Sequence, residues 1–274
     1  MRVGSPPWTD DDLRSSLREF ADLYSTLPIR DNTGGNNSVG LFYIWFCSKH
    51  LDPKVIIENG VWKGATTWLF ETTVPDAQIY SLDPSLGKRQ FISSRAIYSD
   101  RDFSQQSWNT VGETVLVFFD DHQNQLVRLT QSAAFGFKYL LFDDNYPEFC
   151  SDRHLSLEAI LEQRHSEGYD IPLGAREFLL SAIRTYYVFP PIFPHDQTVP
   201  SERYPVLEKP LFHEPLTQYE VYRKDMCTYR WTTFVELNLP VDMPLPDWGG
   251  PAHSRIGRNP LALFKRLKEQ WWPL

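Results

Sequence analysis

Residues 55–64 read Val-Ile-Ile-Glu-Asn-Gly-Val-Trp-Lys-Gly, and this stretch decides the predicted fold class. Its first three residues form a β-branched run, which is typical of a strand buried on both faces of a parallel sheet. Gly60 and Gly64 then bracket a tight turn, where a side chain would keep the backbone away from a ligand. Residues 65–71 can continue as a helix. A strand, a glycine turn and a helix together predict the first half of a nucleotide-binding crossover unit.

Acidic residues follow the next predicted strands at the points where those strands end. The strand predicted over 78–83 ends at Asp83, where a carboxylate can accept hydrogen bonds from both ribose hydroxyls of an adenosine. A plain Asp-Pro turn is the alternative explanation for this residue. A third strand is predicted over 96–103, and its Asp102 would approach the adenine side of the same ligand.

Two further predicted strands, 114–122 and 137–145, each run into an Asp-Asp pair. Ligands of open α/β sheets bind beyond the carboxyl ends of the strands, so both pairs should face one crevice. Like charges placed that close repel each other unless a cation or a proton lies between them. Asp121, Asp144 and Asn145 supply the hard oxygen ligands that Mg²⁺ prefers, which predicts a divalent metal site. The alternative is that one aspartate of each pair caps a helix or a turn.

The first fifty residues predict two helices with a polar loop between them. Thr9 can cap the first helix, and the second is predicted over 39–50. Residues 29–38 are polar and glycine-rich. We expect them to form either an ordinary surface loop or a loop that lies over a cofactor or acceptor.

The composition excludes several classes of protein. A length of 274 residues predicts one large domain, or one with a smaller appendage, and a hydrophobic fraction of 42% suffices for a core. A net charge of -8 without any basic block argues against nucleic-acid binding. Three widely spaced cysteines indicate neither a disulfide framework nor a zinc site. Neither a signal peptide nor a membrane-spanning run is visible, so we expect a soluble, cytoplasmic protein.

The C-terminal part of the chain shows weaker patterns. Helical periodicity is present over 155–165 and 174–186, and residues 230–237 predict a late antiparallel strand at a sheet edge. Residues 260–272 predict a final amphipathic helix. The segment 186–215 is rich in proline and aromatic residues. It either builds an acceptor pocket or forms a rigid cover over the sheet.

The motif Glu58-x-Gly60-x-x-x-Gly64 resembles the first motif of class I S-adenosylmethionine-dependent methyltransferases, whereas the nicotinamide fingerprint Gly-x-Gly-x-x-Gly is absent. Asp121-His122 and Asp144-Asn145 resemble the metal-binding positions of catechol-type O-methyltransferases. Related patterns occur in the macrolide-sugar O-methyltransferases and in the cephalosporin-hydroxylase-like group. The resemblance covers about residues 50–150.

This resemblance implies roles for the matching residues. The glycine turn, with Lys63 inside it, would approach the amino-acid end of S-adenosylmethionine, and Glu58 would bind the ammonium directly or through water. Asp121, Asp144 and Asn145 would hold Mg²⁺, which would bind two oxygens of the acceptor. The sequence departs from the catechol type at the catalytic lysine, because Asn124 stands at that position. His122 or Asp121 would then have to act as the base, although a histidine at a strand end can equally be a structural hydrogen-bonding group.

We therefore expect a doubly wound, mostly parallel α/β fold of the class I methyltransferase kind. A helical cap (1–50), a cofactor-binding core (51–150) and the remainder (151–274) would form one compact domain. The expected activity is methyl transfer from S-adenosylmethionine to an oxygen of a small hydroxylated acceptor, such as a sugar or polyol, assisted by a divalent cation. A homo-oligomer is compatible with this expectation, whereas a nucleic-acid or membrane partner is not.

Two alternatives remain open. In a metal-dependent nucleotide-sugar glycosyltransferase, Asp120-Asp121 would be the acid pair that binds the metal and the nucleotide. That interpretation leaves the glycine motif and Asp83 unexplained. The other alternative is a non-catalytic or differently reacting member of the methyltransferase fold, because the base has no clear candidate.

Overall fold

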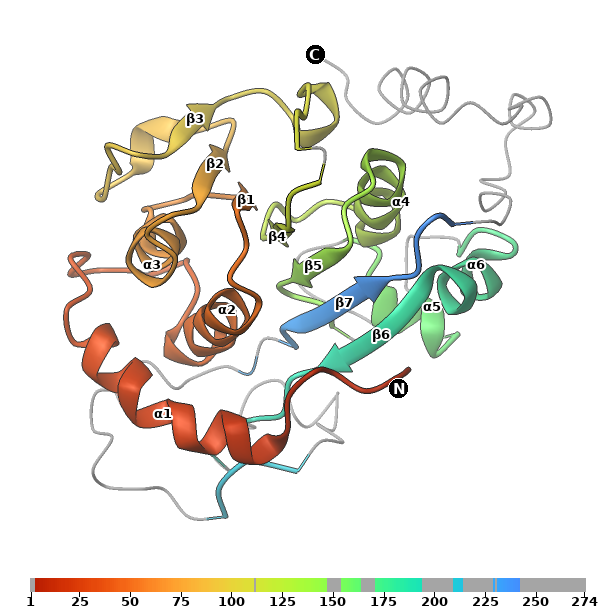
Figure 1. Cartoon of the computed structure of the whole chain (residues 1–274), viewed down its shortest axis with the longest axis horizontal. Coiled ribbons are helices and arrows are strands. Elements are labelled where there is room, and N and C mark those ends of the chain that lie inside the picture. The colour runs from red at the N-terminus through yellow and green to blue at the C-terminus, as the bar shows by residue number, and fades with distance from the viewer. Residues whose placement is uncertain are drawn as a thin grey trace.

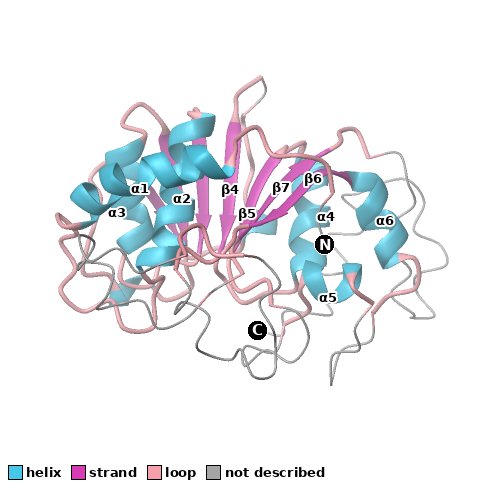
Figure 2. Ribbon diagram, turned by 90° about the horizontal axis from the view of Figure 1, so that it is seen from below, coloured by secondary structure: helices cyan, strands magenta, loops and turns pink. Residues whose placement is uncertain are grey.

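The computed structural model describes residues 3–110, 112–146, 154–163, 171–193, 209–213, 229 and 231–241. At the centre of this described part lies a seven-stranded sheet with helices on both faces (Figures 1 and 2). In chain order the strands are β1 (Val55–Asn59), β2 (Gln78–Leu82), β3 (Ile97–Ser99), β4 (Val115–Phe119), β5 (Tyr139–Phe142), β6 (Ile183–Val188) and β7 (Thr233–Leu237).

The sheet is mostly parallel, and its winding reverses between β1 and β4. The strand order is β3-β2-β1-β4-β5-β7-β6, and the first five strands in this order are parallel to their neighbours. β7 lies between β5 and β6 and is antiparallel to both. This order, with its single antiparallel strand next to the last position, is that of the class I methyltransferase fold. The predicted doubly wound fold class is therefore confirmed.

Hydrophobic side chains that alternate along the strands form a separate core on each face of the sheet. Ile56 of β1 packs with α1 (Asp10–Tyr24), α2 (Ser38–Leu51) and α3 (Ala65–Thr73). Ile57 packs on the opposite face with α4 (Gln125–Phe135), α5 (Leu157–Leu161) and α6 (Ala175–Ala182). Figure 1 shows the two groups of helices on either side of the strands. Within the described residues, none of the helices has the length and apolar character needed to cross a bilayer.

The two predicted N-terminal helices are present. Thr9 caps α1 through a capping box with Asp12, and the apolar side of α1 is buried. The side chain of Asn37 caps α2 by accepting the Gly40 backbone N–H at 3.0 Å. Most of α2 is buried, because it packs against α1 and α3. The apolar and aromatic composition of residues 39–50 follows from this central position.

Several predicted elements differ from the structure. The helix predicted over 174–186 ends at Ala182, and the chain continues as β6, because the following β-branched and aromatic residues pair with β7. β7 itself lies inside the sheet and not at the predicted edge. The third predicted strand is shorter, covering only Ile97–Ser99. The predicted helix 260–272 lies outside the described residues.

Candidate functional site

A cavity of about 240 Å³ lies beyond the carboxyl ends of β1, β2 and β4, where the winding of the sheet reverses. Open α/β sheets bind their ligands at this position. The volume is slightly below the range of about 300–1,000 Å³ that is typical of ligand pockets. The predicted site residues in its wall are Gly60, Asp83, Asp102, Asp121 and His122. The other predicted site residues, Glu58, Lys63, Gly64, Asp144 and Asn145, lie outside this wall.

Gly60 and Gly64 are required by the turn itself. Both have positive φ angles, 96° and 92°. A Cβ atom on Gly60 would lie 2.1 Å from the carbonyl oxygen of Asp120, and one on Gly64 would lie 2.6 Å from that of Phe91. The sequence predicts that the glycines let the backbone approach a ligand closely. In the structure they let it approach other backbone of the protein itself, at Asp120 and Phe91. The turn therefore packs directly against the end of β4.

Asp83 follows β2 and holds the glycine turn. Its Oδ2 accepts the backbone N–H groups of Val61 at 2.9 Å and Trp62 at 3.0 Å, and its Oδ1 accepts the N–H of Ser85 at 2.6 Å. A carboxylate offers about four acceptor positions, of which three are used here. In this conformation Asp83 can accept one ribose hydroxyl, not the two that the sequence predicts.

Glu58 lies beneath the turn and is fully buried. Its carboxylate accepts hydrogen bonds from the hydroxyls of Thr66, Thr67 and Ser81, the last two at 2.6 Å. Burial raises the pKa of Glu58 to about 7, although the three hydroxyl groups act in the opposite direction. Glu58 thus joins β1, β2 and α3 from inside the protein. The structure does not place it in the cavity wall, where the predicted contact with a cofactor would be made.

Arg128 on α4 holds Asp102 and Asp121 together. Only 5% of the Arg128 side chain is exposed, and its Nη2 lies 2.6 Å from Oδ2 of Asp102 and 2.7 Å from Oδ2 of Asp121. Burial alone would raise the pKa of Asp102, but Arg128 and Ser104 outweigh this effect and lower it. Asp102 also caps the short 3₁₀ helix η2 (Phe103–Gln105). The three charged side chains make one wall of the cavity.

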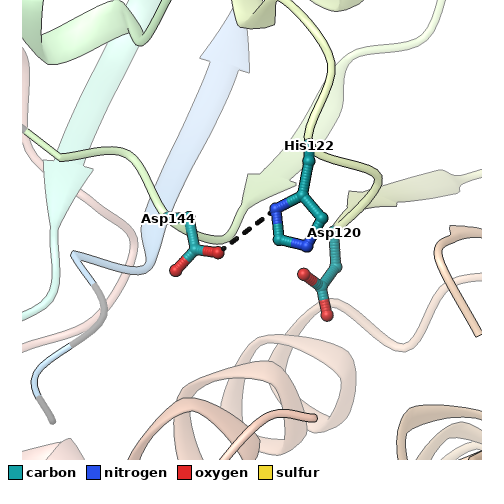
Figure 3. A group of neighbouring side chains, drawn as sticks. All are labelled: Asp120, His122 and Asp144. Atoms are coloured by element: carbon teal, nitrogen blue, oxygen red, sulfur yellow. Dashed lines mark ion pairs between the residues drawn. The ribbon is translucent and has the colours of Figure 1, made fainter. Parts of the chain in front are cut away.

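Asp120, His122 and Asp144 form a cluster beyond the ends of β4 and β5 (Figure 3). One potential ligand atom of each residue lies within 4.8 Å of the others. Nδ1 of His122 is 3.6 Å from Oδ2 of Asp144. The Asp144 side chain is 2% exposed and that of His122 is 53% exposed, so the cluster opens to solvent on the histidine side. A space of about 10 Å³ beside these residues is close to the size of one water molecule or ion.

The backbone of this cluster is strained. His122 and Asp144 have φ angles of 52° and 50°, in the left-handed region that non-glycine residues rarely adopt. Such conformations cost about 1–3 kcal/mol each and are concentrated at functional sites. Asn145 anchors the chain next to Asp144, because its amide donates to the Tyr186 hydroxyl at 2.6 Å and to Thr233 Oγ1 at 2.8 Å.

Of the predicted metal set of Asp121, Asp144 and Asn145, only Asp144 belongs to this cluster. Asp121 points to Arg128, and Asp120 takes its place beside Asp144. The ion pair with Arg128 holds the Asp121 carboxylate away from the cluster, so Asp120 is the aspartate of the pair that faces it. Asn145 is fully buried in its own hydrogen-bond network and supports the cluster from behind.

The polar loop before α2 covers the cavity. Gly34 belongs to the cavity wall. The indole Nε1 of Trp62 donates to the Thr33 carbonyl at 3.1 Å, and Lys63 Nζ donates to the Asp31 carbonyl at 2.7 Å. The sequence left open whether this segment is an ordinary surface loop or a loop that lies over a ligand, and its place over the cavity favours the second interpretation. Lys63, predicted to bind the cofactor, is used here to hold the loop.

The described residues of the aromatic segment 186–215 contribute to the core on one face of the sheet. Phe189, Ile192, Phe193 and Leu211 are buried in the core formed with α1 and α2. Within residues 186–193 and 209–213, no side chain lines the cavity beyond β1, β2 and β4. For these residues the structure favours the interpretation as a rigid cover.

No family model and no curated protein matches this chain. Among solved structures, the cmcI-N160 structure with SAH is 16% identical over 42% of this chain and 62% of that chain, with a TM-score of 0.33. The SAH-bound Podospora anserina methyltransferase PaMTH1 is 15% identical over 52% of this chain and 64% of that chain, with a TM-score of 0.36. The Bacillus cereus O-methyltransferase in complex with SAH is 16% identical over 51% of this chain and 68% of that chain, with a TM-score of 0.34.

This chain thus spans less than two thirds of the length of the first two structures. At these identities the likeness concerns the fold alone. The function has to be inferred from the site's own geometry.

Sequence reasoning missed two residues of the site, Arg128 and Asn36, and gave Asp120 a role only in the glycosyltransferase alternative. The sequence predicts that the Asp-Asp pair faces the crevice, but the pattern does not show which aspartate turns toward α4. Arg128 lies on a predicted helix, where an arginine normally faces solvent. Its position one turn into α4, close after two acids, is a signal that could have pointed to it. Asn36 belongs to a loop whose path cannot be inferred from composition.

Proposed function

We propose that this protein transfers a methyl group from S-adenosylmethionine to an oxygen of a small hydroxylated acceptor, such as a sugar or polyol, with help from a divalent cation. The observation that carries the proposal is an acidic cavity at the carboxyl ends of β1, β2 and β4, next to a cluster with space for one ion. The position of the cavity matches the ligand site of open α/β sheets. The negative charge of the cavity wall favours a cationic ligand over an anionic one.

The charge of the cavity wall favours a cationic ligand. Five aspartates line it: Asp83, Asp100, Asp102, Asp120 and Asp121. Two arginines oppose them, Arg101 and Arg128, and Arg128 is already paired with two of the acids. S-adenosylmethionine carries one net positive charge, from its sulfonium group. A nucleotide-sugar carries a negatively charged diphosphate, which this wall would repel.

In this proposal the ribose, the adenine and the amino-acid end of the cofactor would each lie near residues in or beside the cavity wall. Asp83 would accept one ribose hydroxyl, and Asp102 with the buried ring of Phe103 would lie on the adenine side. The turn at Gly60 and Gly64 would lie at the amino-acid end. Glu58 would act from beneath, by holding that turn, and not by touching the ligand.

The donor set of the cluster fits a divalent cation. Asp120 and Asp144 offer hard carboxylate oxygens, and His122 adds an imidazole nitrogen. Imidazole suits Fe²⁺ or Zn²⁺ better than Mg²⁺, whereas the carboxylates suit Mg²⁺ and Mn²⁺, so the cluster widens the sequence-based expectation of Mg²⁺. A cation held there would lower the pKa of an acceptor hydroxyl and orient it.

His122 has two mutually exclusive roles within this proposal. As a cation ligand it completes the set with Asp120 and Asp144. As a general base it would be oriented by Asp144 at its Nδ1 and would accept the acceptor's proton at Nε2. A ring nitrogen that donates its lone pair to a cation cannot also take a proton.

A transfer assay tests the proposal. The protein is incubated with S-adenosylmethionine, Mg²⁺ or Mn²⁺ and a panel of hydroxylated acceptors, and release of S-adenosylhomocysteine is measured. We expect release with at least one acceptor class, and its loss in Asp144→Ala with cofactor binding retained. Loss of binding and transfer together would assign Asp144 a structural role. Cofactor binding without transfer to any acceptor would favour a non-catalytic member of the fold.

A further inference from the structure

Asn36 connects the loop over the cavity to the acidic cluster. Its Nδ2 donates to Oδ2 of Asp120 at 2.9 Å, across a large separation in sequence. Asn36 is 4% exposed and Asp120 is half-buried, so this hydrogen bond is partly shielded from water. The orientation of the amide follows from chemistry, because only the NH₂ end can face a carboxylate.

The chain is built to seat this amide. A Cβ atom on Gly40 would lie 2.2 Å from Oδ1 of Asn36, so the first turn of α2 makes room for Asn36 by having glycine there. Asn32 Nδ2 donates to the Asn36 carbonyl at 2.7 Å and closes the loop on itself. The neighbouring Asn37 has a different task, the capping of α2. Of these two consecutive asparagines, Asn37 thus caps the helix and Asn36 hydrogen-bonds to the cluster.

The same loop also covers the cavity. Gly34 lines the cavity wall, and the Trp62 ring lies 3.5 Å from the position of a Cβ on Gly34. Any ligand that fills the cavity under Gly34 therefore contacts the segment that carries Asn36. Asp120, at the other end of that segment's hydrogen bond, is one of the three cluster residues.

We propose that Asn36 is a positioning residue that couples cofactor binding in the cavity to cation binding in the cluster. A cofactor that holds the loop down keeps the Asn36 amide on Asp120, which fixes the Asp120 carboxylate toward His122 and Asp144. Cation binding, in turn, fixes Asp120 and with it the loop. This coupling is reciprocal by thermodynamic linkage. The inference rests on the proposed function, because it assigns both ligands to this site.

The test measures the affinity for Mn²⁺ with and without S-adenosylhomocysteine, by the electron paramagnetic resonance signal of free Mn²⁺. S-adenosylhomocysteine is the suitable probe, because it lacks the sulfonium charge that would repel the cation. For the wild-type chain we expect S-adenosylhomocysteine to raise the affinity for Mn²⁺ about fivefold or more. In Asn36→Ala the enhancement should disappear, with S-adenosylhomocysteine affinity without metal kept within about threefold of wild type.

Asn37→Ser is the matched control. It changes the adjacent asparagine but keeps a good helix cap, so the enhancement should equal that of wild type. Asn36→Ser is the second variant, should Asn36→Ala fail to fold; its shorter side chain cannot reach Asp120, so it should also lose the enhancement.

The outcomes separate the inference from the proposed function. An enhancement in Asn36→Ala equal to that of wild type would overturn the inference and leave the function untouched. The same holds if the wild type binds both ligands independently. If the wild type binds no S-adenosylhomocysteine, the proposed function fails and the coupling fails with it.

Discussion

The guanidinium of Arg128 lies 2.7 Å from the carboxylate of Asp121, and this contact separates the roles of two consecutive aspartates. Asp121 turns into the ion pair on α4, while Asp120 remains with His122 and Asp144 in the cluster. One arginine thereby shapes the cavity wall and leaves the cluster its negative charge.

Replacing Arg128 with methionine should destabilise the fold strongly. Asp102 and Asp121 would then be left next to each other in a largely buried site without a cation. Removing one partner of a buried ion pair costs about 3–5 kcal/mol. Urea unfolding should show this loss at neutral pH. The control is Arg101→Met, which removes an exposed arginine from the same cavity and should leave stability nearly unchanged. Equal effects of the two substitutions would contradict the role given to Arg128.

Glu58 should make stability fall as pH rises between about 4.5 and 7. Its folded pKa of about 7 lies above its unfolded value of 4.5, so in this window the folded state holds a proton that the unfolded state has lost. This difference between the folded and unfolded pKa of Glu58 corresponds to about 3 kcal/mol in the free energy of unfolding. Glu58→Gln should flatten this slope, as urea unfolding at pH 5, 6 and 7 would show. If stability depends on pH equally steeply in wild type and in Glu58→Gln, Glu58 is ionised in the folded protein, which contradicts this prediction.

His122→Ala distinguishes the two roles of the ring. If His122 is a cation ligand, this substitution should lower the affinity for Zn²⁺ by about tenfold or more and change the affinity for Mg²⁺ much less. Calorimetric titration with each metal measures both. If His122 is the base, metal affinities should stay unchanged, and the rate of methyl transfer should fall strongly in the variant. Gln123→Ala, at the next residue, should leave both properties unchanged.

Gly60→Ala should be more harmful than Gly136→Ala. Both glycines have positive φ angles, 96° and 79°, which cost an alanine about 1–2 kcal/mol. At Gly136 nothing lies within 4 Å of the new Cβ, whereas at Gly60 it would meet the Asp120 carbonyl at 2.1 Å. Overlap of this kind adds about 1–3 kcal/mol. Thermal unfolding of the two variants should differ by that amount, and only Gly60→Ala should disturb ligand binding. Similar melting temperatures would contradict the packing of the turn against β4.

Most of the central sheet could be predicted from the sequence. The apolar runs at β1, β4 and β5 are long enough to identify as buried strands, and the glycines mark the turn after β1. The sequence pattern predicts a helix up to residue 186, because residues 183–186 extend the helical pattern of α6, and only pairing with β7 makes them a strand. Local patterns do not contain such long-range pairing.

The site was predictable as a location but not in its contacts. The rule for carboxyl ends of parallel strands brought Asp83, Asp102 and the two acidic pairs to one edge. It could not tell that Asp121 is taken by Arg128, nor that Glu58 faces three hydroxyls inside the protein. These choices depend on side-chain directions, which only the packed structure fixes.

Calorimetric titration with S-adenosylmethionine tests the central claim most directly, with S-adenosylhomocysteine and a uridine diphosphate sugar as comparisons. The acidic wall predicts micromolar binding of S-adenosylmethionine, about -8 kcal/mol, and no detectable binding of the diphosphate sugar without metal. Binding of the nucleotide-sugar with no binding of S-adenosylmethionine would contradict the account and favour a glycosyltransferase.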